Sequence, residues 1–137
     1  MIQYGKAMSL VDANIVLRYL LDDHAELSAK AAAILEQQTV TLPIEAACEV
    51  VYVLQKVYAV NREEIRQLLT GLLHEALVSM EKPEVFIKAL EYFGNTSLDF
   101  VDTLLCAYHT VEGQEVFSFD QKLIQFMQRA NQPLAPI

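Results

Sequence analysis

The sequence contains no tryptophan, only two cysteines, and only four glycines and four prolines in 137 residues. Two cysteines are too few for a disulfide-stapled scaffold, and Cys48 and Cys106 do not form the closely spaced pair that a zinc site needs. We therefore expect both to be reduced thiols packed inside a cytoplasmic protein. The scarcity of glycine and proline predicts a helix-rich chain.

Basic residues are also scarce, because ten lysines and arginines face eighteen acidic residues, for a net charge of −8. This balance argues against a basic nucleic-acid-binding surface and against binding to an anionic membrane. No apolar run is long enough for a membrane span, and the first residues do not resemble a signal peptide. With 53% hydrophobic residues, we expect one domain over residues 1–137, with residues 1–7 as a possible N-terminal extension.

Short apolar runs alternate with segments of helical periodicity along the chain. Strands are predicted at residues 8–11, 40–43, 76–80 and 115–119, with a further edge strand at 133–137. Helices are predicted at residues 13–21, 24–37, 44–58, 61–74, 83–93, 98–111 and 121–129, with Gly94 and Gly113 as stop signals for the fifth and sixth. This alternation predicts an α/β fold with a mostly parallel sheet, whose ligands bind at the carboxyl ends of the strands.

Acidic residues stand at two such ends and at the start of a helix. Asp12 and Asp120 directly follow the strands predicted at 8–11 and 115–119. Each could simply cap the next helix, which stabilises it by about 1 kcal/mol, or could line a site. Asp99 and Asp102 lie three residues apart on one helix face, where the helix dipole favours negative charge.

Glu49 lies in a strongly apolar helix, with no lysine or arginine three or four residues away. A buried, unpaired carboxylate costs several kcal/mol unless a cation compensates it. The alternative is a narrow exposed stripe along the helix. That stripe would contain Glu45, Glu49, Val53 and Lys56.

Several carboxylates that converged on one cleft could not all stay ionised without a counter-ion. Mg²⁺ or Mn²⁺ suits an all-oxygen ligand set, and the sequence offers zinc no cluster of cysteine and histidine. Such a cation would activate a water molecule and stabilise charge on a phosphodiester. The acids therefore indicate a metal-dependent phosphodiesterase.

Four short motifs occur in an informative order, and they read SLVDANIVLR from residue 9, IEAACEVVYVL from residue 44, LDFVDTLLCA from residue 98 and VFSFDQKL from residue 116. In order, spacing and element type they resemble the PIN domain family, especially the VapC-type toxin ribonucleases. The resemblance runs from residue 8 to about residue 129. It implies a three-layer α/β/α sandwich around a central, mostly parallel sheet of four to five strands.

The resemblance also implies the roles of individual residues. The residues expected to hold one or two Mg²⁺ (or Mn²⁺) and to support catalysis are Asp12, Glu49, Asp102 and Asp120. Asp99 is a supplementary candidate ligand, and Asn14 and Ser118 would orient the ligands by hydrogen bonds.

The function implied is that of a Mg²⁺-dependent endoribonuclease that hydrolyses RNA phosphodiester bonds, as the toxin of a type II toxin–antitoxin pair. A homodimer is expected, with an antitoxin bound around residues 44–74 and the acidic cleft. The many apolar residues there could instead be ordinary core or dimer surface. RNA affinity would come from the metal and a few local bases, with Arg18, Lys56 and Lys122 as candidates.

Three alternatives compete with this function. A PIN-domain RNA-processing nuclease without an antitoxin would share the same site. A catalytically silent PIN-like binding module is disfavoured because all four acids are present. A phosphoacceptor receiver domain is disfavoured because Asp12 has no acidic neighbour and an aspartate, Asp120, follows the late strand instead of a lysine.

Overall fold

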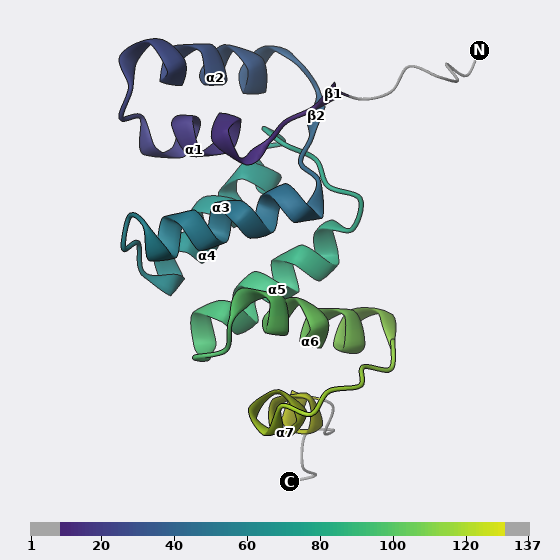
Figure 1. The fold of residues 1–137 in the computed structure, drawn as a ribbon. Coiled ribbons are helices and arrows are strands. Elements are labelled where there is room, and N and C mark those ends of the chain that lie inside the picture. The colour runs from purple at the N-terminus through teal and green to yellow at the C-terminus, as the bar shows by residue number, and fades with distance from the viewer. Residues whose placement is uncertain (1–8, 131–137) are drawn as a thin grey trace, which may run out of the picture.

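The computed structural model describes residues 9–130, which form seven helices and two short strands. Figure 1 shows the helices stacked in a series that begins beside the strands at one end and finishes with the last helix at the other. In chain order the elements are β1 (Ser9–Leu10), α1 (Ala13–Leu21), α2 (Ala25–Gln37), β2 (Val40–Thr41), α3 (Ile44–Lys56), α4 (Arg62–His74), α5 (Pro83–Asn95), α6 (Phe100–Glu112) and α7 (Gln121–Ala130).

All seven predicted helices are present, and their ends follow from capping. Asn61 accepts a hydrogen bond from the backbone of Glu64 at the start of α4. Gly113 ends α6 in the left-handed conformation, at φ 70°, as the sequence predicts. Gly94 does not end α5, so that prediction is wrong: a Cβ there would lie 3.0 Å from a carboxylate oxygen of Glu63. Glycine is needed at this position for the close approach of α4.

The sheet is parallel but much smaller than predicted. Ser9 pairs with Val40 and Leu10 with Thr41, and Ser79 forms an isolated parallel bridge to Thr41 from the other side of β2. The parallel direction is therefore confirmed. The expectation of four to five strands is wrong for the described residues, which contain only two.

Two predicted strands are lost for different reasons. Residues 76–80 contribute only Ser79, whose N–H donates to the Val40 carbonyl over 2.9 Å. Residues 115–119 form no strand, because Val116 packs on a small cluster of Leu98, Cys106, Leu123 and Met127 between α6 and α7. The strand predicted at 133–137 and the extension at 1–7 lie outside the described residues.

The main core lies between α1, α3, α4, α5 and α6, and includes Leu54, Ile65, Phe86, Leu90 and Phe93. Both cysteines are free thiols. Cys106 is buried and Cys48 half-buried, and burial raises the pKa of the Cys106 thiol to about 11. Within residues 9–130, no helix has the length and hydropathy required to cross a bilayer.

Arg62 ties α4 to the connection between α5 and α6. Its Nη1 donates hydrogen bonds to the carbonyls of Phe93, over 3.2 Å, and Leu98, over 2.7 Å. The guanidinium also lies 4.2 Å from the centre of the Phe93 ring. Because Leu98 immediately precedes the helix that carries Asp102, Arg62 helps to place that acid.

We expect Arg62→Ala to lower the free energy of unfolding by about 1–3 kcal/mol, because it leaves two carbonyls without their charged donor. Urea unfolding followed by circular dichroism measures this change. Arg66→Ala is the matched control: Arg66 pairs with Glu63 on the same helix, and we expect a loss below about 1 kcal/mol. Equal losses in the two variants would contradict the role assigned to Arg62.

Candidate metal and catalytic site

The candidate acids lie in two groups. Asp12 and Glu49 belong to the elements around β1, whereas Asp102 and Asp120 lie near each other at the starts of α6 and α7. Over residues 9–130, no three histidine, cysteine or acidic side chains are close enough to hold a metal ion. The structure of one chain therefore does not bring the four predicted ligands together.

Asp12 caps α1. Its Oδ1 accepts a hydrogen bond from the backbone N–H of Ile15 over 3.1 Å, and its side chain is exposed. The capping role that the sequence allowed is thus confirmed. Because a carboxylate has two oxygens, Oδ2 keeps its capacity to bind a ligand. Asn14 is exposed in the first turn of the same helix.

Glu49 is exposed on α3, on the same side as Glu45 and Lys56, while the opposite side buries residues such as Val50 and Leu54. The interpretation of Glu49 as a buried carboxylate is therefore wrong, and the exposed stripe is confirmed. Glu45, for which no metal role was predicted, lines the same surface hollow as Asp12. Only the packing of α3 beside β1 reveals this proximity.

The second group is centred on Asp102, which is half-buried in the first turn of α6. Burial raises the pKa of Asp102, and the negative charges of Asp120 and Asp99 raise that pKa further. The side chain of Asp99, at the N-cap of α6, makes no capping hydrogen bond. This cluster thus holds like charges close enough to oppose ionisation, a situation that a bound cation would relieve.

Asp120 caps α7 in the same manner as Asp12 caps α1. Its Oδ1 accepts from the backbone N–H of Leu123 over 3.0 Å, and its own N–H donates to Ser118 Oγ, also over 3.0 Å. Ser118 therefore positions the backbone of Asp120, which agrees with its predicted supporting role. Of the candidate bases, Lys122 donates to Ser97 over 2.6 Å and Arg18 pairs with Asp23 over 2.8 Å.

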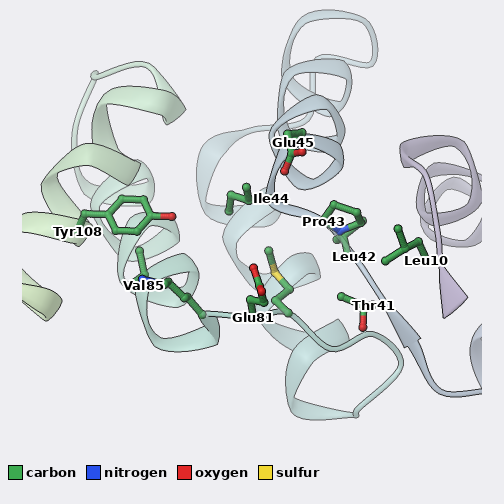
Figure 2. Close-up of a pocket in the computed structure, with 11 residues that line it drawn as sticks. Leu10, Thr41, Leu42, Pro43, Ile44, Glu45, Glu81, Val85 and Tyr108 are labelled. Atoms are coloured by element: carbon green, nitrogen blue, oxygen red, sulfur yellow. The ribbon is translucent and has the colours of Figure 1, made fainter. Parts of the chain in front are cut away.

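A larger hollow, of about 530 Å³, lies between β1 and α6. Figure 2 shows Leu10 on one side of it and Tyr108 on the other, with Ile44 and Val85 between them. Its lining is mainly apolar, with Glu45, Glu81 and Lys82 as charged members. The sequence does not reveal this hollow, because its walls come from segments far apart along the chain.

The chemistry of the donor set suits a hard divalent cation. All the candidate ligands are carboxylates, which Mg²⁺ and Mn²⁺ prefer, and Asp12, Glu49 and Asp120 are exposed to solvent. The residues present therefore fit such a cation in type and accessibility. Their separation into two groups is the feature that a metal site would have to overcome.

The comparisons with known proteins agree with the motifs. A family model described as the PIN domain matches residues 9–127. The search of curated proteins found no match. The search of solved structures found none either.

We expect Asp120→Asn to lower the pKa of Asp102, because it removes one of the charges that raise it, while burial keeps that pKa above its usual range. Carboxyl-carbon NMR titration in metal-free buffer measures this. The stability that Asp102 contributes is present below its unfolded-state pKa and decreases as the pH rises through the raised folded value. Asp22→Asn, at the exposed end of α1, should leave the titration unchanged. An unaltered Asp102 in Asp120→Asn would contradict the cluster.

Proposed function

Because this chain belongs to the PIN domain family, whose members are generally nucleases, we propose that it is a Mg²⁺-dependent endoribonuclease and the toxin of a type II toxin–antitoxin pair. The family match over residues 9–127 is the observation that carries this proposal. Acids at the starts of three helices support it, because each of them lies where a backbone dipole stabilises its ionised form.

The residues proposed to hold the metal are Asp12, Glu49, Asp102 and Asp120, with Asp99 as a supplement. Mg²⁺ or Mn²⁺ bound by them would activate water and stabilise the negative charge that develops on the phosphodiester. The net charge of the chain would remain negative even with two such cations bound. Affinity for RNA must then come mainly from the metal, so we infer a shallow dependence on salt.

The chain's own residues orient these acids. The backbone N–H groups of Ile15 and Leu123 each bind one oxygen of Asp12 and Asp120, so the direction of the other oxygen is set by the helix. Ser118 accepts from the Asp120 N–H and so restrains the turn before α7. These contacts organise the carboxylates before substrate arrives, which lowers the cost of binding a cation.

The proposed antitoxin surface is smaller than the sequence suggests. Of the apolar residues on α3 and α4, Val50, Leu54, Leu69 and Leu72 are core. Tyr52 and Val57 remain 62% and 65% exposed at the end of α3. The acidic chain would suit a partner with a basic segment. The small size of this patch favours a second candidate, an RNA-processing nuclease of the same family without an antitoxin.

We expect the purified protein to cleave RNA only with Mg²⁺ or Mn²⁺ present, and Asp12→Asn and Asp120→Asn each to reduce the rate by at least about 100-fold. A panel of RNAs digested with metal and with EDTA measures both effects. Asp22→Asn is the matched control, because it makes the same chemical change at an exposed aspartate outside the site. It should retain the wild-type rate.

Two outcomes would contradict this proposal. One is RNA cleavage that continues undiminished in EDTA. The other is a wild-type rate in both Asp12→Asn and Asp120→Asn, which would show that these aspartates have no part in the reaction.

A further inference from the structure

The sheet has an open edge at β1. Val11, just after β1, donates its N–H to the Thr41 carbonyl over 3.1 Å. Because successive residues of a strand point their backbone groups to opposite edges, the N–H and C=O of Leu10 face away from β2. No strand among residues 9–130 lies on that side, and the Leu10 side chain is 69% exposed. Such an edge can accept a further strand.

The apolar hollow of Figure 2 adjoins this edge, because Leu10 is one of its lining residues. Leu42, Ile44, Met80 and Val85 supply much of the remaining lining. A strand added beside β1 would therefore project alternate side chains toward an apolar hollow of about 530 Å³. The edge and the hollow together fit an extended segment with large apolar side chains at alternate positions.

One segment of this chain has that pattern. Residues 115–119 have no backbone hydrogen bond to any described residue. Phe117 is 87% exposed and Phe119 is fully exposed. The two phenylalanines share one face of the segment, whereas Val116, on the other face, packs on the cluster between α6 and α7. Two adjacent exposed phenylalanines are unusual unless they mark an interaction surface.

Within one chain, the segment and the open edge lie apart. Figure 1 shows β1 at one end of the stack, whereas the connection from α6 runs to α7 at the other end. The packing of Val116 on Leu98, Cys106, Leu123 and Met127 holds the segment there. A second copy can present the same segment with its phenylalanines facing outward and without disturbing that packing.

We propose that residues 115–119 of one chain add as a parallel strand to the open edge of β1 in a second copy, with Phe117 and Phe119 in the apolar hollow. The contact is reciprocal, so it closes as a two-fold dimer. It rests on the proposed function in one respect: each nuclease site is shared between the copies. Asp12 and Glu49 come from one chain, and Asp102 and Asp120 come from the other.

The parallel direction follows from the acids. Asp12 follows β1 and Asp120 follows the docking segment, and the carboxyl ends of parallel strands meet at one edge of a sheet. Docking in this direction brings together the two groups of carboxylates that one chain keeps apart. The repulsion between them also makes a divalent cation favour the dimer.

The interface can be tested without any assay of cleavage. We expect the wild type to be a dimer in millimolar Mg²⁺ by light scattering after size exclusion, and Phe117→Ser/Phe119→Ser to be a monomer with unchanged thermal stability of the chain, since both rings are exposed. Tyr52→Ser/Val57→Ser is the matched control, because it removes exposed apolar side chains from α3, and it should remain dimeric. A monomeric wild type, or a dimer that loses only the α3 variant, would overturn the proposal.

Complementation tests the shared site. Asp12→Asn and Asp120→Asn, each inactive alone, should recover about a quarter of the wild-type activity when co-expressed, because half of randomly paired dimers are mixed and each mixed dimer contains one intact site. An active wild type with no recovery would overturn the shared site. A wild type that dimerises through Phe117 and Phe119 but cleaves no RNA would instead overturn the proposed function and leave the interface supported.

Discussion

The edge-on contact of Phe100 with Phe86 and Phe93 is the interaction on which the placement of α6 depends. The ring centres lie 5.5 and 5.6 Å apart, and Arg62 covers Phe93 from the other helix layer. Phe100 is the first residue of α6, so this aromatic cluster determines where the helix starts. Asp99 and Asp102 stand one residue before it and two after it. Apolar packing thus holds acids near each other, and the raised pKa of Asp102 reflects the resulting cost.

The same constraint explains how this acidic chain keeps its candidate ligands. Asp12 and Asp120 each bind the N-terminus of a helix through one oxygen, so a structural role stabilises each charge without a metal. A capping aspartate and a metal ligand are therefore compatible functions of one residue. Bringing both groups of acids together requires a cation, because no lysine or arginine pairs with any of the four predicted ligands among the described residues.

The helices were largely predictable because their causes are local. Apolar spacing, the caps at Asn61 and Asp12, and the left-handed Gly113 all act within a few residues. The failures were long-range. Gly94 continues α5 because α4 packs closely against it, and Glu49 is exposed because the apolar side of α3 is narrower than its composition suggests. Neither effect can be derived from the residues that flank these positions.

The sequence by itself determined the helical elements, the family and the identity of the candidate acids, because periodicity, capping and motif order are properties of neighbouring residues. Only the tertiary structure decided the extent of the sheet and the separation of the acids into two groups. The segment at 115–119 has the alternation of a strand, but a strand needs a hydrogen-bonding partner. In one chain, the packing of Val116 beside α7 holds the segment away from the open edge of β1.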